Sequence, residues 1–426
     1  MKDWDPQSEF KRSLDRFPCY PRNLIDPHHR DTESISERLG TNINRVFTFD
    51  KPSSLKVIEL HSGDKEFEDY NVDDVKSHFN PNIKDPLCRI VLLQSDANQS
   101  PALHCSEKQL LYLLSHHQVP PSILEIFIPA AEKSPKPHHF SAVFGEYDTL
   151  SNLYEDQLVL KALDRSGVLI RRCFCFHLTK DDLSLQHCVA YYSYDIRTRR
   201  TFWLIISSDN DFLKVIEGMT RYDDSHDAAH LANDCSSPDK SLRGIFTVLG
   251  FFLERAGQCW KKHILKSIAQ RKAIVESHAT ATKQTSSQLL LSPPSYFQKN
   301  LQDLNHLEEK ALELHLQIEQ NLTITKDMKD SNSTLMASTM LKEQLKTSAC
   351  SEAFFQQASN TERGLKSTLL EIKCHLDQIR ITRTDLVREE TNRRQFQIAV
   401  ILVFILVALL IIFICLIYLS DTRKPA

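Results

Sequence analysis

Two short stretches of the sequence combine side chains that can bind a metal ion. The first, CFCFH, places Cys173, Cys175 and His177 at alternate positions, and alternate side chains of a strand share one face. Three such groups could begin a zinc site, although structural zinc sites mostly take their cysteines from C-x2–4-C spacings. Free cysteine is also among the residues most often buried in a core. The stretch therefore favours a buried strand over a zinc site.

The second stretch, DDSHDAAHLANDC, holds Asp223, Asp224, His226, Asp227 and His230. In a helix the two histidines would be four residues apart and share a face, as zinc ligands do in H-E-x-x-H. Here Asp227 stands where that motif has its glutamate. A solvated surface loop is the favoured interpretation, and Asp223, His226 and His230 are the candidate metal ligands.

Motifs for nucleophilic or phosphate chemistry are absent from the sequence. It contains no G-x-S-x-G, Walker A, G-x-G-x-x-G or kinase signature, and its nine glycines can build few phosphate-binding loops. We therefore predict that the protein is not an enzyme, and no cofactor is evident. A net charge of -3 and the lack of a DNA-binding motif also indicate no nucleic-acid partner.

One apolar segment near the C-terminus is long enough to cross a membrane. No charged residue occurs from Ile398 to Leu419, and such a helix is about 33 Å long at about 1.5 Å per residue, against a hydrocarbon core of about 30 Å. We predict a transmembrane helix at residues 396–420, a short tail at 421–426, and the lipid bilayer as a partner.

The charges that flank this segment predict its orientation. Basic residues are more frequent before the segment than after it: Arg383, Arg388, Arg393 and Arg394 precede it, and Arg423 and Lys424 follow it. In membrane proteins, basic residues concentrate on the cytosolic side. The protein is therefore expected to be single-pass with its large N-terminal part in the cytosol. Eleven scattered cysteines indicate free thiols in a reducing compartment, whereas glycosylation sequons at Asn98, Asn321 and Asn332 argue the other way.

The elements that would position these residues form an α/β domain. Residues 1–84 are rich in Pro, Asp, Ser and Asn, which predicts a loop-rich N-terminal segment. The α/β domain is predicted at residues 85–277. CRIVLLQ, residues 88–94, is typical of a buried strand, and SEKQLLYLLSHH is typical of a helix that Ser106 can cap.

Further strands and helices complete the predicted domain. GVLIRRCFCFHL, HCVAYYSYDI and TFWLIIS predict strands between residues 156 and 207, the last two joined as a hairpin across Arg-Thr-Arg-Arg. DFLKVIEGMT and the long stretch that starts at SLRGIF have helical periodicity. Strands and helices mixed in this way indicate an α/β domain.

Residues 278–292 are a linker by composition, and residues 293–395 are predicted to form a helical stalk. Two apolar stripes step by three and four residues, as in amphipathic helices: they are Leu304, Leu307, Ala311, Leu314 and Ile318, then Leu365, Leu369, Ile372, Leu376 and Ile379. Such helices pack within one chain or between subunits of a homo-oligomer, and the sequence leaves both alternatives open.

Arg383 occupies the next position of the second stripe. A charge inside a helix bundle is costly unless it reaches water or a carboxylate, and Asp385 is too close in sequence to share its face. We therefore expect the stripe to be buried up to Ile379 and to open near Arg383.

Three parts of the sequence resemble a family of fungal proteins that carry a CorA-like transporter domain. They are QLLYLLSHHQVPPSILEIFIP at residues 109–129, YYSYDIRTRRTFWLIIS at residues 191–207, and the closing helices that enter the membrane. The resemblance to CorA implies a cytosolic α/β/α domain, a long stalk helix that becomes a transmembrane helix, and a pentamer that conducts magnesium or related cations. Magnesium is implied by this resemblance alone.

The sequence departs from CorA where transport is decided. CorA-type pores have two spans and a Gly-Met-Asn motif at the outer end of the first, whereas this sequence has one span and its Gly218-Met219 is followed by Thr220. Within the span, Cys415 and Tyr418 are the groups that are less than fully apolar. A cation path needs oxygen ligands to replace lost hydration, so the span itself favours an anchor over a pore.

The sequence thus predicts a cytosolic α/β domain, a long helical stalk and one transmembrane helix. By resemblance it is a membrane protein of the divalent cation transporter superfamily. The alternative is a tail-anchored scaffold or tether that binds a partner through its stalk helices. A membrane-tethered enzyme is a third hypothesis that rests on the histidine and cysteine clusters alone.

Overall fold

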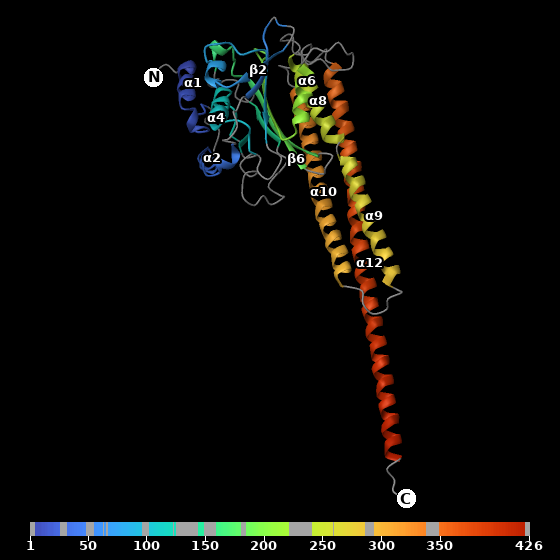
Figure 1. Ribbon diagram of the computed structural model, residues 1–426. Helices are drawn as coiled ribbons and strands as arrows, with labels where there is room; N and C mark the ends of the chain where they lie inside the picture. The colour runs from blue at the N-terminus through green and yellow to red at the C-terminus, as the bar shows by residue number, and fades with distance from the viewer. Residues whose placement is uncertain are drawn as a thin grey trace. The chain divides into compact units, whose positions relative to one another are not determined.

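The computed structural model of the protein describes residues 5–25, 32–47, 55–95 except 63, 65 and 66, 102–124 except 122, 144–148, 159–179, 185–220, 241–285 except 259, 294–337 and 349–421. In this part of the chain a seven-stranded sheet is the central element (Figure 1). Its strands lie in the order β2-β1-β3-β7-β6-β5-β4. Their bounds are β1 Leu55–Leu60, β2 Glu68–Val72, β3 Cys88–Gln94, β4 Phe144–Asp148, β5 Leu169–Thr179, β6 Leu185–Asp195 and β7 Thr201–Ser207.

The sheet mixes parallel and antiparallel neighbours. Strands β3 and β7 are parallel, with Cys88 opposite Thr201, and the other neighbouring pairs are antiparallel. Parallel strands need a crossover connection, and a long one separates β3 from β7 in the sequence. Strands β6 and β7 instead form a hairpin, in which Cys188 lies opposite Ser207. The beginnings of β3 and β7 and the end of β6 therefore meet at one end of the sheet.

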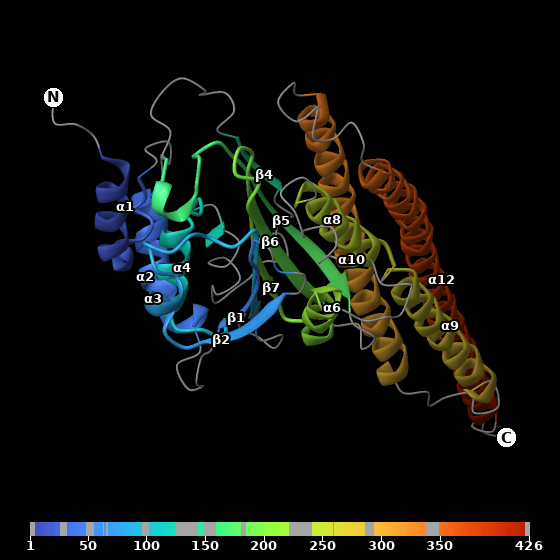
Figure 2. The ribbon, with the colours of Figure 1, turned by 90° about the horizontal axis from the view of Figure 1, so that it is seen from above.

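One face of the sheet is covered by the N-terminal helices (Figure 2). These helices are α1 Pro6–Asp15, α2 Thr32–Val46, α3 Val75–His78 and α4 Glu107–His116, with short 3-10 turns at Phe17–Cys19 and Lys161–Leu163. The core on this side includes Phe10, Leu39, Val91, Leu113 and Leu204, each at most 4% exposed. Burial of such side chains contributes about 1.5–3 kcal/mol each, so these helices are an integral part of the domain.

The other face is covered by helices from later in the chain. These are α6 Asn210–Thr220, α8 Ser241–Gln258, and parts of α10 Pro294–Ala337 and α12 Ala349–Asp421. Ile324 and Met328 of α10 and Phe354 and Ala358 of α12 are buried in the same cluster as Trp203 of the sheet. The second layer therefore includes residues far outside the continuous α/β segment.

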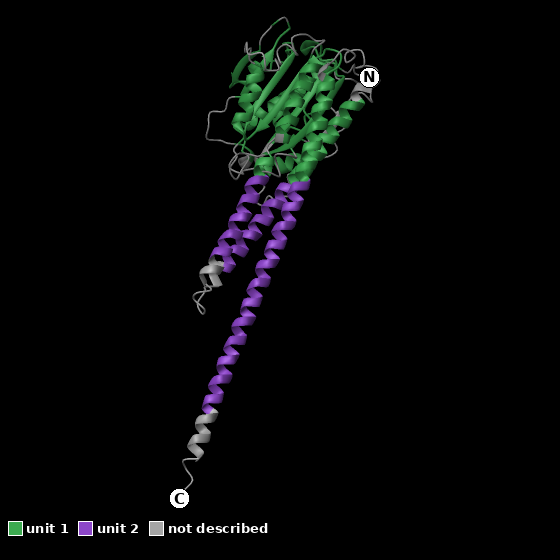
Figure 3. Ribbon diagram, turned by 90° about the vertical axis from the view of Figure 1, so that its right-hand side faces the viewer, with its two compact units in different colours: residues 1–263, 316–369 green, residues 264–315, 370–426 purple. Residues whose placement is uncertain are grey.

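The chain divides into two compact units (Figure 3). The first comprises residues 1–263 and 316–369, and the second residues 264–315 and 370–426. In the second unit, residues 264–285 of α9 (Trp260–Thr285) associate with residues of α10 and α12. Ser267 Oγ lies 2.9 Å from His375 Nε2, which joins α9 to α12. The parts of α9, α10 and α12 in the second unit therefore form a three-helix bundle.

Several predicted elements are confirmed. The strand CRIVLLQ is β3 at residues 88–94, and β6 and β7 form the expected hairpin. Helix α4 starts after Ser106, whose side chain accepts a hydrogen bond from the N–H of Gln109, while the Gln109 side chain accepts one from the N–H of Ser106 in return. Helix α10 begins at Pro294, as expected for a proline in the first turn. The mixed α/β domain, the long C-terminal helices and one apolar helix are all present.

The prediction of a loop-rich segment at residues 1–84 is wrong. This segment holds α1, α2, β1, β2 and α3, and two of these are strands of the main sheet. Asp5 caps α1 by accepting from the N–H groups of Gln7 and Ser8, which is a signal that the sequence contained. Strand β2 is an edge strand that is mostly exposed, so it has no apolar alternation to reveal it.

The predicted linker at residues 278–292 is also partly wrong, because α9 continues to Thr285. The expected order of one α/β domain at 85–277 followed by a separate stalk at 293–395 differs from the interleaved units. The sheet needs residues 316–369 to cover its second face, and periodicity alone does not report which partner a helix covers.

Candidate functional site

The metal ligands predicted from the sequence lie outside the described residues. Asp223, His226 and His230 all fall within residues 221–240, so a metal site there stays a prediction. Within the ranges that the structure describes, no group of three or more His, Cys, Asp and Glu side chains could hold a metal ion.

Strand β5 carries the CFCFH stretch. Cys173 and Cys175 are buried in the cluster that faces the N-terminal helices, whereas Phe174 and Phe176 are buried on the opposite face. Burial raises the pKa of the Cys175 thiol to about 12 and also raises that of Cys173. Both thiols are therefore protonated at neutral pH, which makes them poor metal ligands and weak nucleophiles.

His177, the last residue of the CFCFH stretch, forms two hydrogen bonds through its backbone. Its N–H donates to Asn321 Oδ1 at 3.0 Å and its carbonyl accepts from Asn321 Nδ2 at 2.8 Å. Strand β4 pairs with residues 170–174 of β5, so this α10 side chain supplies backbone partners farther along the same strand. Asn321 is fully buried, which makes its sequon inaccessible in the folded protein.

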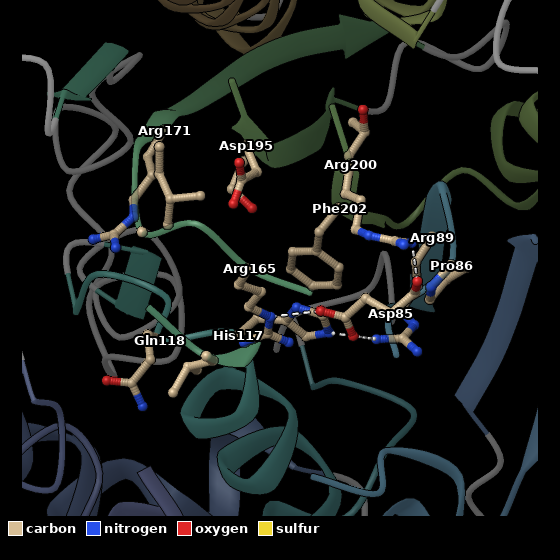
Figure 4. A pocket seen from close by; sticks show the side chains of 15 residues that line it. Asp85, Pro86, Arg89, His117, Gln118, Arg165, Arg171, Asp195, Arg200 and Phe202 are labelled. Carbon is tan, nitrogen blue, oxygen red and sulfur yellow. Dashed lines mark hydrogen bonds and ion pairs between the residues drawn. The ribbon is translucent and has the colours of Figure 1, made fainter. Parts of the chain in front are cut away.

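A charged cavity of about 60 Å³ lies at the end of the sheet where β3 and β7 begin (Figure 4). Residues from the sheet, from the end of α4 and from the segment before β5 line it. Its charged lining residues are Asp85, Arg89, Arg165, Arg171, Asp195 and Arg200. Four guanidinium groups thus share a small cavity with two carboxylates.

Asp85 bridges two of these arginines. Its Oδ1 accepts from Arg89 Nη1 at 2.9 Å and its Oδ2 accepts from Arg165 Nε at 2.5 Å. Burial acts to raise the pKa of Asp85, but the positive charges of Arg165 and Arg89 outweigh it and hold the pKa below the usual range. Asp85 is therefore ionised and both of its carboxylate oxygens are used.

Two histidines at the end of α4 complete the cluster without adding charge. Burial and the neighbouring cations hold the pKa values of His116 and His117 well below the usual value, so both rings are neutral at pH 7. His117 stacks on Phe202 with ring centroids 3.6 Å apart and an interplanar angle of 4°. Its Nε2 lies 3.3 Å from Arg89 Nη1, which makes this nitrogen the acceptor.

Arg200 enters the cavity from the β6–β7 turn. Its Nη2 donates to Asp164 Oδ2 at 2.7 Å and its Nη1 donates to the carbonyl oxygen of Asp85. Its Nε is buried and has no hydrogen-bond partner among the described residues. The same holds for the hydroxyl of Thr201, a residue that also lines the cavity and is 4% exposed.

Asp195 is committed to the turn that carries Arg200. Its carboxylate accepts from the N–H and hydroxyl of Ser166, both at 2.6 Å, and from the N–H groups of Arg197 and Thr198. Arg199 in this turn has a φ of 58°, in the left-handed region that hairpin turns use. Asp195 therefore positions the hairpin and leaves little acceptor capacity for the cavity.

In the second unit, two arginines of α12 form ion pairs with a glutamate of α10 shortly before the apolar segment. Arg383 of α12 donates to Glu308 Oε2 of α10 at 2.5 Å, and Arg380 donates to Glu308 Oε1 at 2.9 Å. The stripe does not end at Ile379, because Leu386 is 6% exposed one turn beyond Arg383. The expectation that the stripe opens at Arg383 is therefore only partly correct: the Arg383 side chain is 39% exposed and is partnered by a carboxylate of the neighbouring helix, but the stripe closes again at Leu386.

Beyond the bundle, α12 is apolar and exposed. From Phe396 to Ile412 its large hydrophobic side chains are each at least 46% exposed, except Val400, which is partly buried. Among the described residues it is the one helix long and apolar enough to cross a membrane. Such a surface is covered by lipid or by other apolar helices.

A family model described as CorA-like transporters matches residues 12–277. The chain belongs to the CorA-like transporters. The match includes the segment before residue 85 that composition had suggested to be loop-rich, in agreement with its place in the sheet. A comparison of this CorA-like chain with curated proteins gives no match.

Two solved structures are similar to this CorA-like chain. The cytoplasmic domain of ZntB from Vibrio parahaemolyticus RIMD 2210633 has a TM-score of 0.37 and 8% sequence identity, covering 79% of this chain and 100% of that one. The full-length CmaX protein has a TM-score of 0.41 and 9% identity, covering 84% of this chain and 85% of that one. The family assignment rests on the family model.

Sequence reasoning missed the charged cavity of this CorA-like chain. Its arginines come from β3, from the segment before β5, from β5 and from the β6–β7 turn, so no local spacing joins them. One local signal existed, since Asp85 and Arg89 are four residues apart and form an ion pair. A pair at that spacing is usually a surface feature of a helix, and here it precedes and begins a strand.

Proposed function

We propose that this CorA-like protein is a membrane-anchored component of divalent cation transport, with magnesium as the cation that the resemblance implies. Helix α12 is the observation that carries the proposal. It is buried along one stripe as far as Leu386 and then exposed on nearly every side from Phe396 to Ile412. A bilayer covers side chains of this kind, so the stalk and the anchor are successive parts of one helix.

The anchor alone does not offer a cation path. Its described part contains no carboxylate, amide or hydroxyl side chain between Ile398 and Ile412, and cations that leave water need oxygen ligands. Transport by one or several copies of the chain therefore requires oxygen ligands from outside residues 398–412 to line the path. Leu370 and Ile381 on α12 and Leu312 on α10 are 43–64% exposed, and they supply an apolar surface for self-association of the stalk.

Flux through reconstituted protein tests the proposal. The full chain is placed in liposomes that contain a magnesium-sensitive dye, and an inward magnesium gradient is applied. We expect a saturable influx above that of empty liposomes, together with cross-linked species larger than one chain. The double variant Leu370→Asp/Ile381→Asp should lose both, because it places charges on the proposed stalk surface.

A second candidate function is a membrane tether or scaffold. The apolar chemistry of the span favours it, because Cys415 and Tyr418 are the least apolar groups from Ile398 to Leu419. Wild-type protein that assembles in liposomes but gives no flux would contradict the transport proposal and leave the tether.

The proposed orientation places the N-terminal part in the cytosol. The arginine excess before the span supports it, as do the buried thiols Cys173 and Cys175, which lie unpaired in the fold. Protease added to the cytosolic side of sealed vesicles should remove nearly the whole chain. A large protected fragment would contradict this orientation.

A further inference from the structure

We propose that the charged cavity at the beginning of β3 and β7 binds a small oxyanion, namely a carboxylate or phosphate group. Transport, as proposed above, makes no use of this cavity, so the two proposals stand independently. The cavity belongs entirely to the first compact unit, and every step of the inference concerns residues of that unit.

Hydrogen-bond donors in the cavity outnumber the acceptors that are still available. Guanidinium groups only donate, and four of them line the cavity. Of the two lining carboxylates, Asp85 already accepts from Arg89 and Arg165 with both of its oxygens, and Asp195 is committed to the β6–β7 turn. A ligand that fits must therefore bring acceptors.

Two buried donors in the cavity are left without an acceptor among the described residues. They are Nε of Arg200 and the hydroxyl of Thr201, from adjacent residues of the β6–β7 hairpin. A buried polar group without a partner costs about 1–3 kcal/mol, and native structures rarely leave one unless a ligand or water fills the place. The two donors therefore mark where the acceptor atoms of the ligand would lie.

The charge and the volume of the cavity limit the chemical class of its ligand. Glu59 and Asp164 partner Arg89 and Arg200 from outside the lining, so the four guanidinium groups are matched by four carboxylates and the cluster carries no charge excess for a highly charged ligand. His116 and His117 are uncharged, so they add no positive charge, and the attraction of an anion rests on the guanidinium groups. A volume of about 60 Å³ admits a carboxylate or phosphate group. In such a partly buried place, bonds from guanidinium to an oxyanion are charge-assisted and strong.

The test measures thermal unfolding of the full chain in detergent by the fluorescence of Trp203 and Trp260, both buried in the first unit. Sodium phosphate, sodium acetate and AMP are each titrated at constant ionic strength held with sodium chloride, which controls for general screening. A ligand of the native state raises the midpoint in a saturable way. If phosphate raises the midpoint and AMP does not, the ligand is a free anion. If AMP raises it as well, the ligand is the phosphate end of a larger phosphomonoester. If acetate raises it, the ligand is a carboxylate.

Variants connect the effect to the cavity. Arg200→Gln removes the charge with its unpartnered Nε, and Thr201→Val removes the hydroxyl while keeping a β-branched shape suited to the start of β7. Each should weaken the apparent affinity about tenfold or more, as expected for the loss of one charge-assisted hydrogen bond. Arg197→Gln is the matched control, because it removes the same charge from the same turn at an exposed position and should leave the affinity unchanged.

Two results would overturn the proposal. One is a wild-type midpoint that does not respond to any of the three ligands beyond the effect of sodium chloride, which would leave water as the occupant. The other is an equal loss of response in Arg197→Gln and in Thr201→Val, which would show that the anion binds elsewhere on the hairpin. If Arg200→Gln does not fold, the comparison of Thr201→Val with Arg197→Gln still decides.

Discussion

Substitution of Glu59 by glutamine tests the buried charge network of the sheet. Glu59 lies on β1 and is 3% exposed. Its Oε1 accepts from Arg89 Nε at 2.5 Å and lies 3.2 Å from His78 Nε2. Burial acts to raise the pKa of Glu59, but the hydrogen bond from His78 and the charge and hydrogen bond of Arg89 lower it to about 2, from 4.5. The folded state thus favours the ionised carboxylate.

The size of the effect follows from this pKa difference. A depression of about 2.5 pKa units corresponds to about 3.4 kcal/mol of folding free energy at pH 7, since one unit is about 1.4 kcal/mol. Because the pKa is lowered on folding, this stability is fully present above pH 4.5 and is lost as the pH falls towards 2. At pH 3 about 1.4 kcal/mol would remain. Glu59→Gln should therefore cost about 3 kcal/mol at pH 7 and about 1 kcal/mol at pH 3.

Urea denaturation followed by tryptophan fluorescence measures the free energy of unfolding at both pH values. Glu37→Gln, at an exposed position on α2, is the matched control and should change the free energy by less than about 0.5 kcal/mol at either pH. A cost of less than about 1 kcal/mol for Glu59→Gln at pH 7, or an equal cost at pH 3 and pH 7, would contradict this prediction. Either result would mean that the ionised carboxylate adds nothing beyond a neutral hydrogen bond.

Three further predictions concern other parts of the fold. Leu376→Asp should destabilise the stalk by about 3 kcal/mol or more, because Leu376 is 5% exposed, and chemical denaturation followed by circular dichroism measures this. The control, Leu370→Asp at a 64% exposed position, should leave the helix content in dilute detergent nearly unchanged. Iodoacetamide should label the exposed Cys374 in the native protein and leave Cys173 unlabelled until urea is added, as mass spectrometry would report. Asn321→Leu should lower the free energy of unfolding by about 2 kcal/mol, because two backbone groups of β5 lose their partners, and an unchanged value would show that water replaces the amide.

Elements defined by local signals could be predicted from the sequence. Strand β3 has an apolar run between polar boundaries, and the capping box of Ser106 and Gln109 encodes the start of α4 within four residues. The stripes of α10 and α12 likewise report which positions are buried, and Leu365, Ile372 and Ile379 are indeed fully buried. Leu369, a member of the predicted stripe, is only partly buried, which the spacing of apolar residues alone does not report.

Features that depend on distant partners could not be predicted. The partner of Arg383 is Glu308, which is 75 residues away in the sequence, and nothing near Arg383 identifies it. The cavity likewise brings together Arg89, Arg165 and Arg200 through the order of strands in the sheet. Strand order depends on which long connections close, and residue spacing carries little information about that.

The late position of the residues that cover the second face of the sheet has a consequence for biosynthesis. A ribosome releases all seven strands before it makes Ile324, Met328, Phe354 and Ala358, which pack against Trp203 and its neighbours. Domains fold as units during synthesis, and incomplete ones expose apolar surface. The second face of the sheet therefore lacks part of its cover until α12 has begun to emerge. Soon afterwards the apolar end of α12 leaves the ribosome, so completion of the domain and delivery of the anchor to a membrane fall close together in time.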